Sequence, residues 1–187
     1  MERLVSHIPF FAASPKISEY VYPNSDYNIA VWQTNANTTT NLYQRVDDVS
    51  NDSDYIKLRN ANWVIDVCPT TATRTFEFDM ASPSATPGTA GQSATVIIRG
   101  KVVDPYTTGF TATLDVYLYE GATLRASDTG NTVSTTYVDH SLSLTAGQIG
   151  SVTDWNNVRV RGTFNMCASG IDADLDAQVS SVYIQFY

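Results

Sequence analysis

Residues 112–127 read ATLDVYLYEGATLRAS, and this stretch decides the fold class. Its first half alternates apolar Leu114, Val116 and Leu118 with polar or tyrosine residues. That two-residue period is typical of a strand with one face in a core and one face toward solvent. The Glu-Gly pair at 120–121 separates this run from a second short run, so the sequence predicts a β-hairpin here.

The same two-residue period recurs along most of the chain. We expect further strands over 27–34, 41–46, 54–58, 62–67, 74–80, 94–103, 132–144, 154–166 and 176–187. One helical turn is expected over 145–150, ended by Gly150. Nine or ten short strands with almost no helix favour a sandwich, and long connections before 94 and around 104–110 favour crossings between two sheets. We therefore predict an all-β fold, a jelly-roll β-sandwich over 25–187 that follows an extended N-terminal arm over 1–24.

Composition limits the classes of partner. The chain has 187 residues, of which 43% are hydrophobic and 16% charged, and its formal net charge is −8 at pH 7. This length supports one domain with a substantial core. An acidic chain with scattered arginines is a poor match for nucleic acid, which needs clustered positive charge. No stretch has the length of a membrane span, and the apolar run near the N-terminus is too short and broken for a signal peptide, so we expect neither.

The N-terminal arm carries apolar surface that must be covered. Three prolines interrupt any long helix, and the arm holds the aromatic pairs Phe10–Phe11 and Tyr20–Tyr22. Exposed aromatic side chains are typical anchors of protein interfaces. We predict that these four residues contact a neighbouring subunit.

The sequence offers little catalytic or metal-binding chemistry. Cys68 and Cys167 are far apart; a disulfide between them is permitted, but the sequence favours two reduced, buried thiols. His140 follows Asp139 on an expected strand, where neighbouring side chains point to opposite faces, which argues against a local dyad. We expect no enzyme, and we assign no catalytic, cofactor-binding or metal-binding residue.

Two arginines stand out in the late segment SVTDWNNVRVRGTF, residues 151–164. Alternation places Val158 and Val160 toward the core, and Arg159 and Arg161 on the outer face. The pattern favours a solvated strand face paired with carboxylates of neighbouring strands. The alternative is that both arginines lie at an interface.

Several parts occur together in a recognisable order. They are NLYQRVDDVSNDSDYIKL, ATVIIRGKV, LDVYLYEGATLRAS, YVDHSLSLTAGQIGSVTDWNNVRVRGTF and QVSSVYIQFY. This set, over about 41–187, resembles a β-sandwich family of accessory virion proteins from tailed bacteriophages. The resemblance implies a structural protein without a catalytic site. Decoration (cement) proteins of similar fold bind the outside of the capsid lattice, frequently as trimers, and relatives sit on tails or fibres.

We therefore expect a capsid decoration protein that binds the major capsid protein lattice as a homo-oligomer, with residues 1–22 in contact with the lattice or with a neighbouring subunit. Its expected location is the capsid exterior, after assembly in the host cytoplasm. The alternatives are a tail or fibre component, or a carbohydrate-binding module, that recognises host-surface glycans. If the protein binds glycans, the candidate sugar platforms, whose flat rings would pack against a sugar, are Trp32, Trp63, Trp155, Tyr117 and Tyr119.

Overall fold

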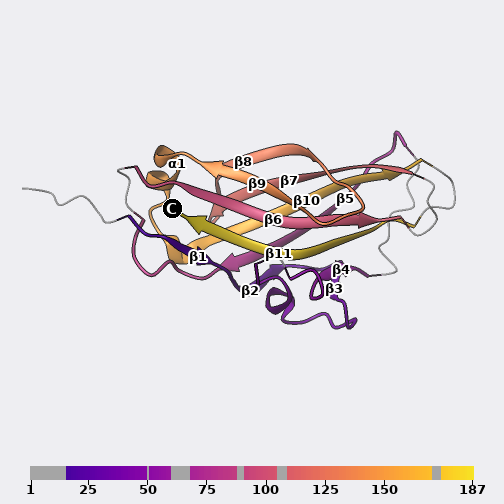
Figure 1. The fold of residues 1–187 in the computed structure, drawn as a ribbon, viewed down its shortest axis with the longest axis horizontal. Coiled ribbons are helices and arrows are strands. Elements are labelled where there is room, and N and C mark those ends of the chain that lie inside the picture. The colour runs from indigo at the N-terminus through magenta and orange to yellow at the C-terminus, as the bar shows by residue number, and fades with distance from the viewer. Residues whose placement is uncertain (1–15, 50, 60–67, 88–90, 105–108, 170–173) are drawn as a thin grey trace, which may run out of the picture.

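The strands of this protein form two antiparallel sheets around one hydrophobic core (Figure 1). The structure is a computed structural model, and it describes residues 16–49, 51–59, 68–87, 91–104, 109–169 and 174–187. Sheet A has the order β3 (Trp32–Thr34), β4 (Ile56–Leu58), β11 (Asp176–Phe186), β6 (Ala94–Val103) and β9 (Val138–Leu144), and β1 (Glu19–Val21) also pairs with β11. Sheet B has the order β2 (Pro23–Asn28), β5 (Ala72–Met80), β10 (Val158–Ala168), β7 (Phe110–Glu120) and β8 (Thr123–Thr132).

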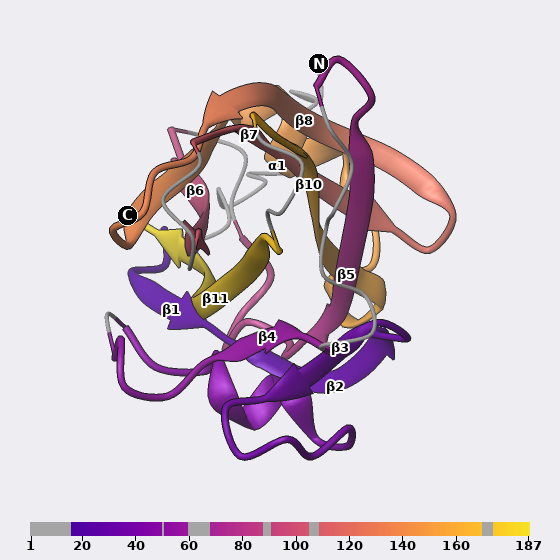
Figure 2. The same ribbon diagram turned by 90° about the vertical axis from the view of Figure 1, so that its right-hand side faces the viewer.

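The connectivity is that of a jelly roll, which confirms the predicted fold class. From β4 onward the chain alternates between the sheets, except at the β7–β8 hairpin, which stays within sheet B. The eight strands therefore lie in the orders β4-β11-β6-β9 and β5-β10-β7-β8. This interlocked arrangement of two Greek keys defines the jelly roll. The end-on view in Figure 2 shows β5, β10 and β7 on one side of the interior and β6 and β11 on the other.

Large aromatic side chains fill the space between the sheets. Trp32 packs edge-on against Phe76 with ring centroids 5.2 Å apart, and Phe164 adjoins both rings. Gly162 lies in β10 directly beneath Phe76, where a Cβ atom would come within 2.2 Å of the ring. The ring can occupy this position only because residue 162 has no side chain.

Two predicted strands differ from the structure for identifiable reasons. The run 27–34 divides between β2 and β3, which belong to different sheets, and a turn bond from Trp32 N to Ile29 O lies between them. The run 41–46 forms a 3-10 helix, Leu42–Arg45, instead of a strand. The carboxylate of Asp26 accepts hydrogen bonds from the backbone N–H groups of Leu42 and Tyr43, so a residue distant in sequence caps this helix. The expected strand over 62–67 lies outside the described residues.

Other local expectations are confirmed. The strand over 94–103 is β6 with the same bounds. The expected helical turn is α1 (Ala146–Ser151), which lies at the end of the sandwich where the chain finishes (Figure 1). Gly150 does not end it as predicted, because the helix continues to Ser151 and its C-cap is Val152. Thr145 and Gln148 form a capping box at its start. The expected strand over 132–144 is shorter than predicted, because β9 begins only at Val138.

The expectation of two reduced thiols is wrong, because Cys68 and Cys167 form a disulfide. Cys68 N donates to Ala168 O, so the backbone before β5 continues alongside β10. This pairing brings the two cysteine Cα atoms to 5.2 Å, within the range that a disulfide spans. Because the cysteines are 99 positions apart in the sequence, only the β5–β10 pairing could have revealed their proximity.

Candidate functional site

The described part of the arm places a tyrosine cluster on the outer face of sheet A. Tyr20 lies on β1 opposite Gln185, is 48% exposed, and packs edge-on against Tyr183 at 5.6 Å. Tyr22 lies 6.3 Å from Tyr20 and 6.2 Å from Tyr183. The predicted anchors Tyr20 and Tyr22 are thus together, and they cover Tyr183, which is 6% exposed. Phe10 and Phe11, the other two predicted anchors, lie outside the described residues.

A buried glutamine fixes the arm to the end of the chain. Gln92 Oε1 accepts from Ile17 N at 2.9 Å, and Gln92 Nε2 donates to Ile17 O at 3.1 Å and to Tyr187 O at 3.2 Å. Gln92 is 1% exposed, so these bonds are shielded from water. The arm from Ile17 onward is therefore held in place before it reaches the tyrosine cluster.

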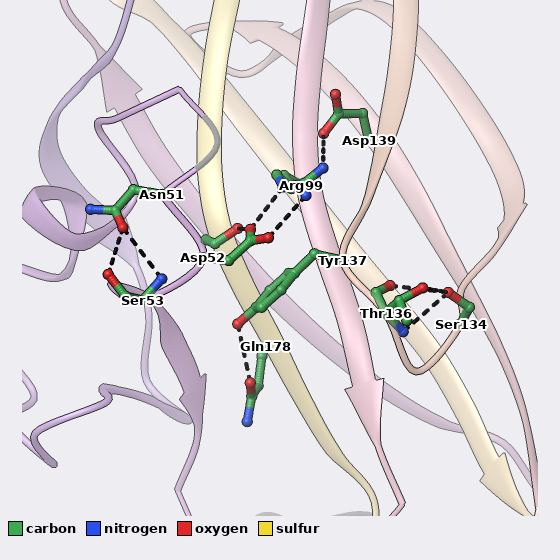
Figure 3. Close-up of polar contacts among 10 residues, drawn as sticks. Asn51, Asp52, Ser53, Arg99, Ser134, Thr136, Tyr137, Asp139 and Gln178 are labelled. Carbon is green, nitrogen blue, oxygen red and sulfur yellow. Dashed lines mark hydrogen bonds and ion pairs between the residues drawn. The ribbon is translucent and has the colours of Figure 1, made fainter.

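Beside the cluster, an ion-pair network ties an acidic loop to the same face (Figure 3). Arg99 on β6 donates to both carboxylate oxygens of Asp52, at 2.8 and 2.9 Å, and to Asp139 on β9 at 3.0 Å. Ser180 on β11 also donates to Asp52, at 2.9 Å. The hydrogen bonds from Arg99 lower the pKa of Asp52. The sequence did not indicate this network, because only the pairing of β6 with β9 and β11 brings these residues together.

Tyr137 lies next to this network and over β6 and β11. Figure 3 shows its hydroxyl directed at Gln178, to which it donates at 3.1 Å, and Lys101 Nζ lies 4.3 Å from the ring centroid. Asp176 accepts from Gln178 and from Leu58 N. Burial raises the pKa of Asp176 to about 6. We call Tyr20, Tyr22, Tyr183, Arg99 and Tyr137 together the β11 face.

The two predicted arginines lie on the outer face of sheet B, as expected, but they are not on a solvated surface. Arg159 and Arg161 both form ion pairs with Glu77 on β5, at 2.7 and 3.0 Å. Glu77 is 1% exposed and the Arg159 side chain 8%, whereas Arg161 keeps 31% exposure. Arg159 also donates to Gly121 O, and Arg161 to the Tyr119 hydroxyl at 3.1 Å. The carboxylate that pairs with both arginines is therefore buried, and the expectation of a solvated strand face is wrong.

Tyrosine rings cover Arg159 and Arg161, and the sequence alone did not predict these contacts. Tyr27 lies at an irregularity in β2, and its ring centroid is 3.9 Å from the guanidinium carbon of Arg159. Tyr119 lies 4.4 Å from the guanidinium carbon of Arg161, and Tyr117 lies 6.3 Å from Tyr119. Tyr27 is 58% exposed. We call these three tyrosines and two arginines the β10 face.

The end of the sandwich near α1 is stabilised by a buried carboxylate. Glu120 accepts from Thr153 N, from Thr153 Oγ1 and from Asp154 N, at 3.1, 2.6 and 2.7 Å. These hydrogen bonds, with that from Thr153 Oγ1 the largest contribution, lower the pKa of Glu120 to about 2. The bonds hold the turn that carries the chain from sheet A to sheet B. A small pocket above this turn is lined by Ser82, Pro83, Thr86, Thr153, Asp154, Trp155 and Asn156.

Two of the three tryptophans named as sugar platforms do not present their rings to solvent. Trp32 is fully buried and Trp155 is 7% exposed, while Trp63 lies outside the described residues. Among the described residues, no three His, Cys, Asp or Glu side chains gather closely enough to hold a metal ion. A search of the described helices for one with the length and apolarity to cross a membrane found none.

Comparison with known proteins gives no family. No protein-family model and no curated protein matches the chain. Among solved structures, an arabinose-bound α-L-arabinofuranosidase aligns over 88% of this chain and 25% of its own, at 10% identity and a TM-score of 0.40. The Stig cyclase Fisc from Fischerella sp. TAU aligns over 96% of this chain and 80% of its own, at 10% identity and a TM-score of 0.41. At these values neither neighbour indicates what this chain does, and the resemblance to phage virion proteins stays a prediction.

Proposed function

We propose that this chain is a non-enzymatic accessory protein of a phage virion, which binds the outer surface of the capsid through its β11 face and N-terminal arm. The observation that carries the proposal is the tyrosine cluster at β1. It offers a half-exposed ring, Tyr20, on a rigid base formed by Tyr22 and Tyr183. Rigid tyrosine anchors next to polar groups are typical of binding hot spots in protein interfaces.

The rest of the β11 face supports the same role. Arg99 is held between Asp52 and Asp139, so its charge is balanced before any partner binds. Tyrosine and arginine are enriched at protein interfaces, and a fixed geometry lowers the entropy lost on binding. The neighbouring acidic loop, 47–54, directs this face toward a partner with complementary basic groups.

A protein of this kind stabilises the capsid by linkage. If it binds the assembled lattice and not the free capsid subunits, each bound copy lowers the free energy of the assembled state. No chemical step is required. The trimer implied by the resemblance is part of this proposal, and the molar mass of the purified chain in solution measures it directly.

The test uses particles that lack this protein, together with purified variants of the chain. Removal of residues 1–15 leaves β1 and the Gln92 contacts in place, and should abolish or strongly weaken binding to the particles. Tyr20→Ala should weaken binding about tenfold, the loss expected for one stacked aromatic anchor. The matched control is Tyr27→Ala, an exposed tyrosine on the opposite sheet, which should bind particles normally.

Immunogold microscopy with an antibody to the loop 82–93 then locates the protein. Gold over the whole head is the expected result. Gold confined to the tail would overturn the capsid assignment in favour of the tail or fibre alternative. Unchanged particle binding by both the truncated chain and Tyr20→Ala would show that the arm and the tyrosine cluster are not the docking surface.

A further inference from the structure

We infer that the β10 face is a binding site for neutral glycans, separate from the surface proposed to contact the capsid. The two surfaces are the outer sides of different sheets, so both can be occupied at once. The inference does not depend on the capsid role, because it concerns the outer side of sheet B, whereas the β11 face lies on sheet A.

The first observation is a charged group buried on the solvent side of a sheet. Glu77 is 1% exposed, although it is its neighbours on β5, Phe76 and Phe78, whose side chains enter the core. A buried ion pair costs desolvation and adds little stability compared with apolar residues of similar size. Its clearest effect here is to fix two guanidinium groups, Arg159 and Arg161, in defined positions on the sheet surface.

The second observation is a stripe of tyrosines that lies over the two fixed arginines. Tyr27 has the Arg159 guanidinium on one side of its ring and is 58% exposed. Tyr119 contacts Arg161, and Tyr117 continues the stripe along β7. Rings fixed in this way present flat apolar surface without further loss of side-chain entropy, and tyrosine also offers a polar hydroxyl.

The third observation is a row of fixed hydroxyl and amide groups beside the stripe. Thr75 and Thr163 bond across β5 and β10 at 3.2 Å, and Thr73 donates to Asn165 at 3.0 Å. Asn165 in turn donates to Asp115 at 3.0 Å. All five residues are at least partly exposed, so each can exchange hydrogen bonds with a ligand above the sheet.

These features together match the chemistry of a sugar chain. A pyranose ring has a flat face of C–H groups, which packs on tyrosine, and a rim of hydroxyls, which pair with fixed donors and acceptors. This face carries no excess positive charge: Arg159 and Arg161 lie beside Glu77, with Asp79 and Asp115 on nearby positions of β5 and β7. The site therefore favours a neutral polysaccharide over an anionic one.

The experiment is affinity electrophoresis of the purified full chain in gels that contain hydroxyethylcellulose, xylan, galactomannan or dextran. We expect at least one of these neutral polysaccharides to retard the protein. Tyr27→Ala should weaken that binding about tenfold, and Tyr119→Ala should weaken it as well. Tyr20→Ala on the β11 face and Asn156→Ala in the small pocket should leave it unchanged.

Each other outcome overturns the inference. Retardation by none of the four polysaccharides means that the face does not bind neutral glycans. Retardation lost with Asn156→Ala but kept with Tyr27→Ala moves the site to the pocket. Particle binding that is lost with Tyr27→Ala, without polysaccharide binding, makes the β10 face a protein-docking surface. The capsid proposal is tested separately, by measuring how Tyr20→Ala and the chain without residues 1–15 bind to particles.

Discussion

Replacing Glu77 with glutamine should destabilise the fold far more than any other single carboxylate-to-amide change on the outer faces. The substitution keeps the size and shape of the side chain but removes its charge. Arg159, with a side chain 8% exposed, and Arg161 would then lose their common counter-ion. Removing one partner of a buried ion pair costs about 3–5 kcal/mol, because the remaining charge stays buried without compensation.

The matched control is Asp54→Asn. Asp54 pairs with Arg45 at 3.1 Å, at a distance like those in the Glu77 pairs, but the two side chains are 27% and 41% exposed. An exposed pair of this kind contributes less than about 1 kcal/mol. Both substitutions therefore turn a paired carboxylate into an amide, and they differ mainly in how deeply the ion pair is buried.

The assay is urea unfolding followed by tryptophan fluorescence, since Trp32 lies in the core next to Phe76. The free energy of unfolding should fall by about 3–5 kcal/mol for Glu77→Gln and by less than about 1 kcal/mol for Asp54→Asn. Added salt should reduce the loss of unfolding free energy only for Asp54→Asn, since screening acts mainly on exposed charges. Equal, small losses in both variants would refute the reasoning that the cover of tyrosines keeps Glu77 out of water.

Three further predictions follow from the core, the disulfide and the buried acid. Gly162→Ala should lower the free energy of unfolding by about 1–3 kcal/mol, and Phe76→Leu in the same chain should recover part of that loss, as measured by urea unfolding. Reduction of the Cys68–Cys167 disulfide should cost up to about 4.7 kcal/mol for a loop of this length and lower the melting temperature by about 10–20 °C in calorimetry. The pKa of Asp176 is raised from 3.8 to about 6 in the folded protein, so the folded state holds its proton more tightly than the unfolded chain. Between pH 7 and pH 4 the wild type should therefore gain about 2.4 kcal/mol relative to Asp176→Asn, and a pH-independent difference would contradict this.

Most of the strands could be predicted from the sequence because each has one face in the core. Alternation over 94–103 and 112–120 gives the strand, its buried face and its approximate length, since the side-chain period is a local property. A prediction from alternation is wrong at 27–34, where the two-residue period continues although the chain passes from one sheet to the other. It also fails at 41–46, where a 3-10 helix is capped by Asp26 from another strand.

The candidate surfaces were predictable only in part, for a related reason. Alternation correctly placed Arg159 and Arg161 on the outer face, but it could not show what covers that face. The cover is Tyr27, which lies on an edge strand far away in the sequence, and its ring reaches Arg159 only through the irregular pairing of β2 with β5. The pair of Asp52 with Arg99 was missed for the same reason, because a loop and a strand meet there through tertiary structure alone.

The charged groups on the two outer faces differ in how they are paired and exposed, and this difference supports two different partners. On the β11 face, Arg99 is paired with carboxylates that are 40% and 47% exposed, so a partner protein can replace or extend those pairs. On the β10 face, the carboxylate between the arginines is buried, and a ligand can reach tyrosine rings, threonine hydroxyls and the side chains of Asn165 and Asp115. Exchangeable charges suit a protein lattice, where complementary charge sets orientation and association rate. Fixed rings and hydrogen-bonding groups without excess positive charge suit an uncharged ligand, and for this reason we assign the glycan to the β10 face and the capsid to the β11 face.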